Sequence, residues 1–401
     1  MKVLLIHNSY RTSAPSGEDA VFNNERDLLQ EKGLDVVSYE KFNDDIDDTS
    51  LLKRARLGIN YAWSQDSFFE VKDLLAKVRP DIAHVHSIHP QISPSVYFAC
   101  QKAGVPVVHT LHNYRYICPG ALLQRDGQPC EDCVGRWPFP ALKHRCYRGS
   151  LLATGSVFWM ISRNRLRKTF TSAVNRFIAL TQFAASRFVA GGLPATRMEI
   201  KPNFLPNPPS LSQERENYAV YIGRLSAEKG VETLVSSWKS VDKIPLKILG
   251  DGPLRGALEA EARQYGLNIE FLGSRPRTEV LSVVGQARFQ LVPSEWYEGF
   301  PMVILEAYAC GTPVVASRIG SLAEVIHDGE TGLHFEPGNP QDLAQKVKLI
   351  TEQSETAQRM GNKARQLFME KYTAEQSFAH LMGVYQRAQE DLQRREVKKS
   401  E

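Results

Sequence analysis

Ser294-Glu295-Trp296-Tyr297-Glu298-Gly299-Phe300-Pro301 joins an apolar run to a segment of helical character. The run before it, Phe289–Val292, is typical of a strand buried in a parallel sheet. Pro301 suits the first position of a helix, and Gly311 suits the end of that helix. The sequence therefore predicts a strand, a loop and a helix, the repeating unit of doubly wound α/β folds.

In such sheets, ligands bind beyond the carboxyl ends of the strands, where loops meet helix N-termini. Free N–H groups at a helix N-terminus suit a phosphate, and carboxylates suit sugar hydroxyls. Glu298 in the loop and Glu306 in the helix have the spacing E-x7-E. Glu306 lies in an apolar run, where an idle carboxylate would be costly to bury. We expect a nucleotide-sugar site here; the alternative is a pair of glutamates on a solvated helix face.

The composition bounds the class of protein. The chain has 401 residues, 42% of them hydrophobic. This length exceeds what one hydrophobic core usually holds, so two domains are predicted. The start is too quickly polar for a signal peptide, and no apolar run approaches the roughly 20 residues of a membrane span, so we expect a cytoplasmic protein. The net charge of +4 is uneven, because basic residues exceed acidic ones up to about Ser210 and acidic residues exceed basic ones after it. The first part is therefore expected to meet something anionic, and a solvated surface with a modest basic excess is the alternative. A nucleic acid is not expected as a partner.

The first part of the chain alternates strands and helices. Its first loop contains Ser16, Gly17 and Glu18 but lacks G-x-G-x-x-G, so a dinucleotide fingerprint is absent; we assign these residues to the acceptor side. The polar segment 43–48 contains a D-x-D, which we interpret as a solvated turn because no strand presents it. The expected strands are 2–7, 34–39, 82–86, 105–110 and 176–180, with a helix at 20–31.

A proline-rich linker leads into a second alternation. The expected strands there are 219–222, 246–249, 269–272, 289–292, 313–316 and 333–335. The expected helices are 230–239, 254–265, 277–285, 301–310 and a helical segment from Gln341 to the end. The predicted domains are 1–203 (Rossmann-like, acceptor side), 218–372 (Rossmann-like, nucleotide-sugar side) after a linker at 204–217, and a helix with a charged tail at 373–401 that can return to the first domain.

Glycine-rich turns mark one edge of the second sheet. Gly223 permits a close backbone approach, and Arg224 and Lys229 can pair with a diphosphate, although a surface turn with ordinary charges is the alternative. The next strand ends in a similar turn that contains Gly250 and Gly252. These turns favour a phosphate-binding edge.

Several motifs together resemble a family. Gly223-Arg224-Leu225 with Glu228-Lys229-Gly230, Gly250-Asp251-Gly252-Pro253, Glu298-Gly299-Phe300-Pro301 with Glu306, and Ala309–Pro313 with Gly329-Glu330-Thr331-Gly332 are similar to retaining glycosyltransferases of family 4. The resemblance covers about 218–339 and is looser in the first domain. It implies the GT-B fold, in which two doubly wound Rossmann-like domains face each other across a cleft.

The resemblance also implies roles. Arg224 and Lys229 hold the donor diphosphate together with the turns at Gly223, Gly250 and Gly252, Glu306 holds the ribose, and Glu298 with Gly299, Phe300 and Pro301 holds the transferred sugar. No divalent metal is required. Cations at the diphosphate stabilise the charge that grows as the glycosidic bond lengthens. No residue is assigned as a covalent nucleophile, which favours front-side attack.

On the acceptor side, His112 looks like the family's histidine that reaches the donor sugar, and we count it with Arg224, Lys229 and Glu298 as catalytic. Members often have aspartate where this chain has Asn113, so a structural histidine is the alternative. His84, His86 and His89 are interpreted as packing or loop residues, and a metal site is the alternative.

An insertion at about 115–150 carries four cysteines: Cys118, Cys130, Cys133 and Cys146. One C-x2-C flanked by two thiols can hold a structural zinc ion; unpaired thiols and a redox pair are the alternatives. The insertion resembles one found in a subset of the family.

Basic residues bracket the apolar run Leu151–Ile161, which contains Phe158 and Trp159. This pattern suits either an anionic membrane surface or a core helix with a basic end. The first interpretation predicts a peripheral membrane protein with a lipid-linked saccharide acceptor. The basic residues are Lys143, Arg145, Arg148, Arg163, Arg165, Arg167 and Lys168.

The predicted activity is transfer of a sugar from a UDP- or GDP-sugar to a saccharide acceptor in cell-surface polysaccharide or glycolipid synthesis. A sugar-nucleotide epimerase and a non-catalytic nucleotide-sugar-binding protein on the same fold are the alternatives.

Overall fold

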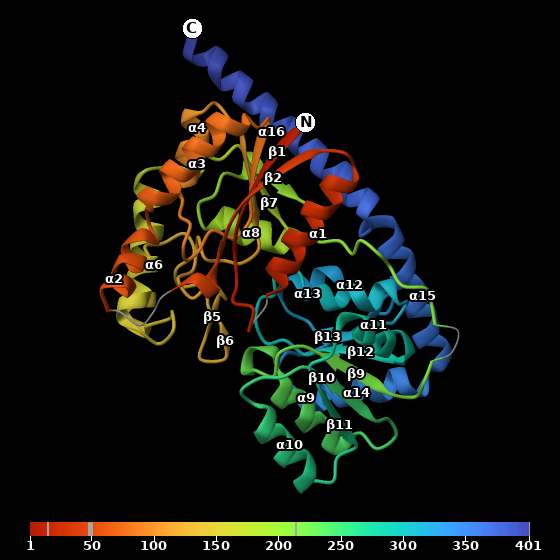
Figure 1. Cartoon of the computed structure of the whole chain (residues 1–401). Coiled ribbons are helices and arrows are strands. Elements are labelled where there is room, and N and C mark those ends of the chain that lie inside the picture. Colours follow the sequence, from red (N-terminus) through yellow and green to blue (C-terminus); the bar gives the residue numbers. More distant parts are fainter. Residues whose placement is uncertain (14–15, 47–50, 213–214, 401) are drawn as a thin grey trace. The chain divides into compact units, whose positions relative to one another are not determined.

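The computed structural model describes residues 1–13, 16–46, 51–212 and 215–400. By its contacts the chain divides into two compact units. Unit 1 comprises Met1–Leu123, Cys130–Asn203 and Ser377–Glu401, and unit 2 comprises Gln124–Pro129 and Phe204–Gln376. Each unit is built on a six-stranded sheet whose neighbouring strands are all parallel (Figure 1). The predicted α/β class with two doubly wound domains is confirmed.

The sheet of unit 1 has the strand order β2-β1-β3-β4-β7-β8. Strand β1 is apolar from Val3 to Ile6 and fully buried there, as a strand covered on both faces must be. The edge strand β8 is absent from the strands expected from the sequence. The strands are β1 (Lys2–Ser9), β2 (Asp35–Phe42), β3 (Ile82–Val85), β4 (Val107–Leu111), β7 (Arg176–Ala179) and β8 (Met198–Ile200).

Helix α1 begins earlier than expected because Ser16 caps it. The Ser16 hydroxyl accepts from the Glu18 N–H, and the Asp19 carboxylate accepts from the Ser16 N–H, which completes a capping box. Phe22 and Leu29 of α1 pack with Val384 of α16 on the sheet. The helices are α1 (Gly17–Glu31), α2 (Leu51–Asn60), α3 (Gln65–Val78), α4 (Ser95–Lys102), α5 (Phe139–His144), α6 (Leu151–Leu166), α7 (Thr169–Ser172), α8 (Gln182–Ala190) and α16 (Ala374–Ser400).

Part of the D-x-D segment is described: Asn43–Asp45 forms a 3-10 turn, and Asp44 accepts hydrogen bonds from the backbone and hydroxyl of Thr12. Asp47 and Asp48 lie outside the described residues. The interpretation of the segment as a solvated turn stays a prediction.

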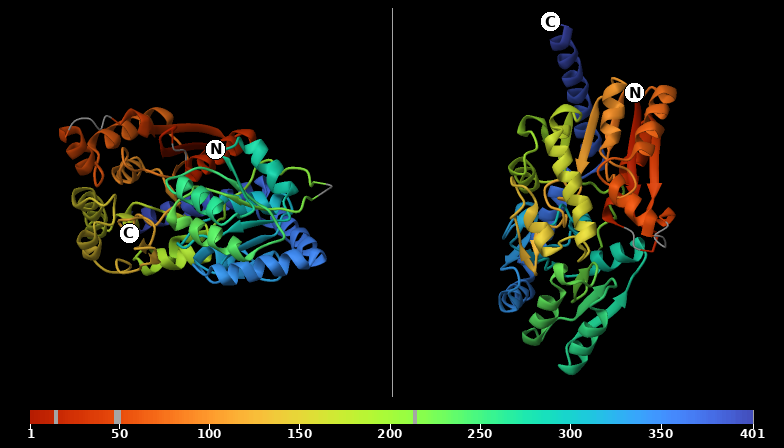
Figure 2. Two further views of the ribbon diagram at one scale, coloured as in Figure 1. Left: turned by 90° about the horizontal axis from the view of Figure 1, so that it is seen from below. Right: turned by 90° about the vertical axis from the view of Figure 1, so that its left-hand side faces the viewer.

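The sheet of unit 2 has the order β11-β10-β9-β12-β13-β14. Its strands and flanking helices can be followed in Figure 1 and from two further directions in Figure 2. The strands are β9 (Ala219–Ile222), β10 (Leu246–Leu249), β11 (Ile269–Gly273), β12 (Phe289–Val292), β13 (Val314–Ser317) and β14 (Gly332–Phe335). A short hairpin, β5 (Gln124–Arg125) with β6 (Gln128–Pro129), also belongs to this unit.

The helical segment expected from Gln341 to the end is three helices, interrupted at Gln353 and at Tyr372–Thr373. Asn339 caps the first of them, since its side chain accepts from the Asp342 N–H. The helices of unit 2 are α9 (Val231–Ser237), α10 (Arg255–Gln264), α11 (Arg277–Gln286), α12 (Met302–Ala309), α13 (Gly320–Val325), α14 (Pro340–Glu352) and α15 (Ser354–Lys371).

Candidate active site

The strand order of unit 2 reverses at β9. This strand pairs with β10 on one side and with β12 on the other. The chain therefore leaves β9 and β12 in two loops that begin next to each other, and such a switch point is where α/β sheets bind ligands. The two loops are the ones that carry Lys229 and Glu298.

Lys229 and Glu298 form an ion pair, with 2.6 Å between Nζ and Oε1. The same carboxylate accepts from the Ser294 hydroxyl at 2.8 Å and from the Trp296 indole N–H at 2.9 Å. Glu298 is only 5% exposed, so its charge needs these partners. The ammonium also lies 5.1 Å from the centre of the Trp296 ring. The two loops are thus joined through charged groups at the strand ends.

Glycines let the loops of this edge touch backbone to backbone. A Cβ on Gly250 would lie 1.9 Å from the carbonyl oxygen of Gly223, and one on Gly252 would lie 2.5 Å from that of Leu225. Gly230, directly after Lys229, has φ of +66°, and a Cβ there would lie 1.9 Å from the Pro293 carbonyl oxygen. Side chains at these positions would push the loops apart. The glycines therefore hold the position of Lys229.

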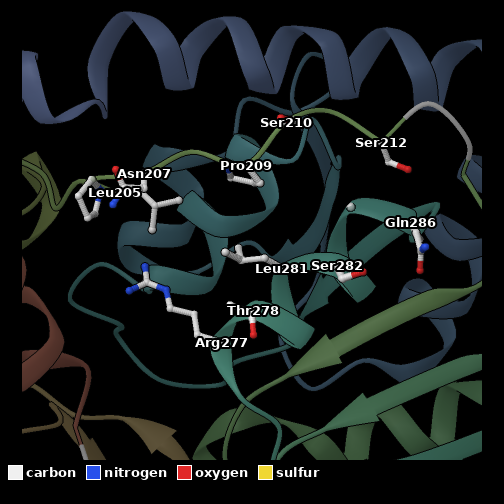
Figure 3. Close-up of a pocket in the computed structure, with 12 residues that line it drawn as sticks. Leu205, Asn207, Pro209, Ser210, Ser212, Arg277, Thr278, Leu281, Ser282 and Gln286 are labelled. Atoms are coloured by element: carbon white, nitrogen blue, oxygen red, sulfur yellow. The ribbon is translucent and has the colours of Figure 1, made fainter.

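The second glutamate lies apart from that ion pair. Glu306 on α12 is 8% exposed, and its carboxylate is 3.5 Å from the Arg277 guanidinium. Burial raises the pKa of Glu306, and Arg277 opposes that shift. Arg277 also lines a pocket of about 590 Å³ between α11 and the segment after Leu205. Figure 3 shows Arg277 at one end of this pocket, with Thr278, Leu281 and Ser282 along α11.

The remaining predicted donor residues occupy the same two loops. Arg224 is exposed, and its side chain has no ion pair within the described part of the chain. Phe300 is buried, and its ring centre is 5.7 Å from that of Tyr372. Pro301 caps α12 in an extended conformation, and Gly299 precedes this cap by two residues. The structure thus places a free cation and a paired cation on the β9 loop.

In unit 1, His112 follows β4 and is half-buried. Its Nε2 lies 3.0 Å from Nδ1 of His86, and Nε2 of His86 lies 3.2 Å from Oε1 of Glu25. The other oxygen of Glu25 accepts from Lys201 Nζ at 2.9 Å. A chain of buried polar groups therefore runs from Lys201 to His112.

The order of donors in this hydrogen-bonded series determines which ring nitrogen of each histidine carries the proton. Burial alone would raise the pKa of Glu25, but Lys201 and His84 lower it well below its ordinary value, so Glu25 is ionised. His86 must then donate from Nε2 and accept at Nδ1. His112 in turn donates from Nε2, which leaves its Nδ1 as a hydrogen-bond acceptor. Burial lowers the pKa of His86 to about 3 and that of His112 well below its ordinary value, so both rings are neutral.

Glu25, His84 and His86 bring three ligand atoms within 4.8 Å of one another, the only such group of His, Cys, Asp or Glu within the residues that the structure describes. His84 also contacts the Tyr385 and Thr110 hydroxyls, each at 2.8 Å. An added metal ion would meet the Lys201 ammonium on the same carboxylate. The packing interpretation of His84 and His86 omits this network, which orients a candidate catalytic side chain.

Ser16, Gly17 and Glu18, which we assign from the sequence to the acceptor side, lie at the start of α1. The two oxygens of Glu18 accept from the Asn113 amide at 2.8 Å and from the Ser87 hydroxyl. Ser16 is occupied as the cap of α1, and Gly17 is the first residue of the helix. Asn113, which stands where related proteins often carry aspartate, thus serves Glu18 rather than His112.

None of the four cysteines of the insertion is in a disulfide. Burial and the neighbouring Cys118 raise the pKa of Cys133 to about 12. Three sulfurs around a zinc ion would lie about 4 Å apart, given Zn–S bonds of about 2.3 Å. No three of these sulfurs come within 4.8 Å of one another, so the insertion must contract if it holds the ion. The zinc site stays a prediction.

Three of the basic residues near α6 serve contacts within unit 1. Arg163 and Arg167 lie over the ring of Trp63, 4.7 and 5.3 Å from its centre. Arg165 donates to the backbone of Arg136. The exposed apolar side chains on α6 are instead Leu151, Leu152, Trp159 and Leu166. Among the described helices, none is both long and apolar enough to pass through a membrane.

Two family models match adjacent parts of the chain. Glycosyltransferase Family 4 matches residues 29–206, and Glycosyl transferases group 1 matches residues 207–367. Together the two models match residues 29–367, and the chain is a glycosyltransferase of the family 4 type. The predicted family is confirmed; the subset with the cysteine-rich insertion stays a prediction.

Two relatives that are glycosyltransferases by name agree with this family. Alpha-D-kanosaminyltransferase of Streptomyces kanamyceticus is 26% identical over 343 residues, which are 82% of this chain and 83% of the relative. An uncharacterized glycosyltransferase of Methanocaldococcus jannaschii is 34% identical over 171 residues, 42% of this chain and 48% of that relative. The chain thus matches only about half the length of the second protein.

Solved structures show the fold. HepE of Anabaena in complex with UDP has a TM-score of 0.66 at 17% identity, covering 96% of this chain and 99% of that one. Sucrose-phosphate synthase of Thermosynechococcus elongatus has a TM-score of 0.69 at 18% identity, covering 96% and 98%. The predicted GT-B fold is confirmed.

Some functional candidates were missed by sequence reasoning. Both Glu25 and Lys201 are buried charges: Glu25 lies in a helix that was assigned only a structural role, and Lys201 follows the strand β8, which was not expected. Arg277 was expected only as the start of a helix. A charged residue on the apolar side of a predicted amphipathic helix can indicate a buried polar network, and Glu25 in α1 is such a residue.

Proposed function

We propose that this protein transfers a hexose from a nucleoside diphosphate sugar, with UDP or GDP as the nucleotide, to a saccharide acceptor, and retains the anomeric configuration. The observation that carries the proposal is the Lys229–Glu298 ion pair at the switch point of unit 2. A cation there suits a diphosphate, and the fixed carboxylate suits sugar hydroxyls. HepE of Anabaena, which shares the fold, was solved with UDP and with UDP-glucose.

In the proposed reaction, Arg224 and Lys229 hold the diphosphate and Glu306 the ribose. Glu298, with the Gly299–Pro301 segment, holds the transferred sugar, and His112 accepts from one of its hydroxyls. The bond from the anomeric carbon to the phosphate oxygen breaks as the acceptor hydroxyl attacks the same face. The acceptor proton passes to the leaving phosphate oxygen. Lys229 favours the transition state because the leaving diphosphate gains charge as that bond lengthens.

No metal is needed for this transfer, since cationic side chains neutralise the diphosphate. The structural zinc in the cysteine insertion is a separate proposal. Purified protein is expected to carry about one equivalent of zinc. A strong chelator should loosen the insertion and leave donor binding intact. Protein with four mobile, readily alkylated thiols and no metal would refute it.

The acceptor is proposed to be lipid-linked, in the synthesis of a cell-surface polysaccharide or glycolipid, with the protein held in the cytoplasm at an anionic membrane. The support is the exposed apolar face of α6 beside Lys168 and Arg148. Vesicles that contain anionic lipid should bind the protein, and salt should weaken that binding. Because Arg163 and Arg167 pack on Trp63, the informative variant is Trp159→Gln with Leu152→Gln. Unchanged vesicle binding in this variant would refute the membrane contact.

A donor screen tests the main proposal. Thermal unfolding is measured with UDP- and GDP-sugars, and the ligand that stabilises is then incubated with and without saccharide acceptors. Transfer that requires an acceptor supports the proposal. Conversion of the sugar nucleotide without acceptor identifies an epimerase, and binding without turnover identifies a binding protein.

A further inference from the structure

Unit 1 contains an arginine without a counterion. Arg115 follows β4 by four residues, and its Nη1 is buried with no hydrogen-bond partner. Among the described residues, no carboxylate forms an ion pair with it. Its guanidinium carbon lies 4.8 Å from the centre of the Tyr147 ring. A buried cation in this state is costly unless a ligand completes it.

Another cation and several aromatic side chains lie around Arg115. Arg148 lies over the same Tyr147 ring, 5.3 Å from its centre, and likewise has no ion pair in the described part of the chain. Tyr61 contacts Tyr147 edge to face and stacks on His89, with ring centres 4.2 Å apart. Both ring nitrogens of His89 are buried without a partner. Among these side chains, the buried polar atoms without a partner are therefore Nη1 of Arg115 and the two ring nitrogens of His89, whereas Tyr61 hydrogen-bonds Tyr147.

The cations of this cluster are Arg115 and Arg148, and the acids Glu18 and Asp19 lie near enough to act on Tyr10. Glu18 is the acid whose field reaches Arg115, but its oxygens are occupied by Asn113 and Ser87. Burial and the charge of Arg115 hold the pKa of His89 well below its ordinary value, so this ring is neutral. The pKa of Tyr10 is raised by Glu18 and by burial, and that of Tyr61 by burial, so both phenols keep their protons.

We infer that Arg115 and Arg148, with the phenols of Tyr10, Tyr61 and Tyr147, form a subsite for a phosphate group of the acceptor. Two guanidinium groups and several neutral O–H donors match the many oxygens of a phosphate better than the two of a carboxylate. The inference extends the proposed function and depends on it in one respect. The bound phosphate belongs to an acceptor only if the protein catalyses the proposed transfer. The phosphate belongs either to a lipid-linked diphosphate or to a soluble sugar phosphate.

Binding of inorganic pyrophosphate tests the subsite without any transfer reaction. Wild-type protein should bind at two sites, one in each unit, as measured by calorimetry and located by hydrogen exchange. Arg115→Met should abolish protection of residues 112–118 and leave the site around Lys229. Lys229→Met should do the reverse. Arg148→Met, at an exposed position, should weaken the first site by about tenfold, as for the loss of one charge-assisted contact.

Far-ultraviolet circular dichroism establishes that the variants fold, and Arg148→Met covers the case in which Arg115→Met does not. Pyrophosphate binding in unit 1 that is unchanged in a folded Arg115→Met and in Arg148→Met would overturn the inference. So would binding confined to the Lys229 loop.

Transfer assays then distinguish the sources of the phosphate. A polyprenyl diphosphate saccharide in detergent, a hexose 1-phosphate and a neutral alkyl glycoside serve as acceptors. Arg115→Met should lower kcat/KM about tenfold or more for one phosphate-bearing acceptor, with donor KM unchanged, and should spare the neutral glycoside. An equal loss for all three acceptors would overturn the assignment. Failure of every transfer would refute the proposed function but leave the pyrophosphate result standing.

Discussion

Lys229 and Glu306 are both assigned to the donor, but their surroundings differ. Lys229 faces Glu298 at 2.6 Å, whereas Glu306 faces Arg277 at 3.5 Å in a buried place. Lys229→Met should lower kcat by about 10²–10³, because its charge matters most as the diphosphate leaves. Glu306→Gln should instead raise the donor KM and change kcat little. Steady-state kinetics decide this, and equal effects of both variants on KM alone would contradict the assigned roles.

His112 offers a second prediction at this scale. The chain Lys201–Glu25–His86 requires His112 to carry its proton on Nε2. In protein labelled with ¹⁵N-histidine, the signal lost in His112→Asn should therefore show an unprotonated Nδ1 at pH 7. His86→Phe removes the nitrogen that accepts from His112, so the His112 ring should no longer be restricted to the tautomer protonated on Nε2. An Nδ1–H ring or an imidazolium in the wild-type protein would contradict the proton order.

At the scale of elements, the loops after β9 and β10 depend on contact between glycines. Gly250→Ala places a methyl group 1.9 Å from the Gly223 carbonyl oxygen and should destabilise unit 2 by about 2–3 kcal/mol. Donor binding should weaken as the β9 loop shifts. Chemical denaturation and thermal shift with donor measure the two effects.

Gly256→Ala is the matched control. Gly256 lies on exposed helix α10, and a Cβ there meets nothing within 4 Å. This change should be neutral or stabilise by up to about 1 kcal/mol, as expected for alanine in a helix. If both variants behave alike, contact between the loops is not what requires Gly250.

At the scale of the whole molecule, the two units should respond differently to acid. His86, His89, His109 and His112, all in unit 1, have pKa values lowered chiefly by burial. Below about pH 6.5 the unfolded chain takes up protons that the folded unit does not. Each such histidine then costs about 1.4 kcal/mol of stability per pH unit. In unit 2, burial raises the pKa of Glu306. Protonation of this carboxylate in acid therefore removes the cost of burying its charge and does not destabilise the unit.

We therefore expect unit 1 to lose stability steeply between pH 6.5 and pH 5, before unit 2. Hydrogen exchange followed by mass spectrometry at pH 7.5, 6.5 and 5.5 assigns the opening to a unit, after correction for the intrinsic exchange rate. His89→Phe should shift the midpoint to lower pH. Loss of protection in unit 2 first would contradict the prediction.

The sequence by itself determined the fold class, the family and the loops that we propose to bind the donor. Apolar runs such as Phe289–Val292 specify buried strands locally, and the motifs around Lys229 and Glu298 are continuous in the chain. The start of α1 was predicted wrongly, because the capping interactions of Ser16 with Glu18 and Asp19 were overlooked in the sequence.

Only the tertiary structure decided which distant charges meet. Glu25 lies in α1, whereas His86, His112 and Lys201 directly follow β3, β4 and β8, and no local pattern links the four residues. Arg163 and Arg165 illustrate the same limit, since their spacing suited a membrane surface, while packing turns one onto Trp63 and the other to the Arg136 backbone. Hydrophobic periodicity is a local property of a chain, whereas pairing of buried charges depends on strand order, which long-range packing determines.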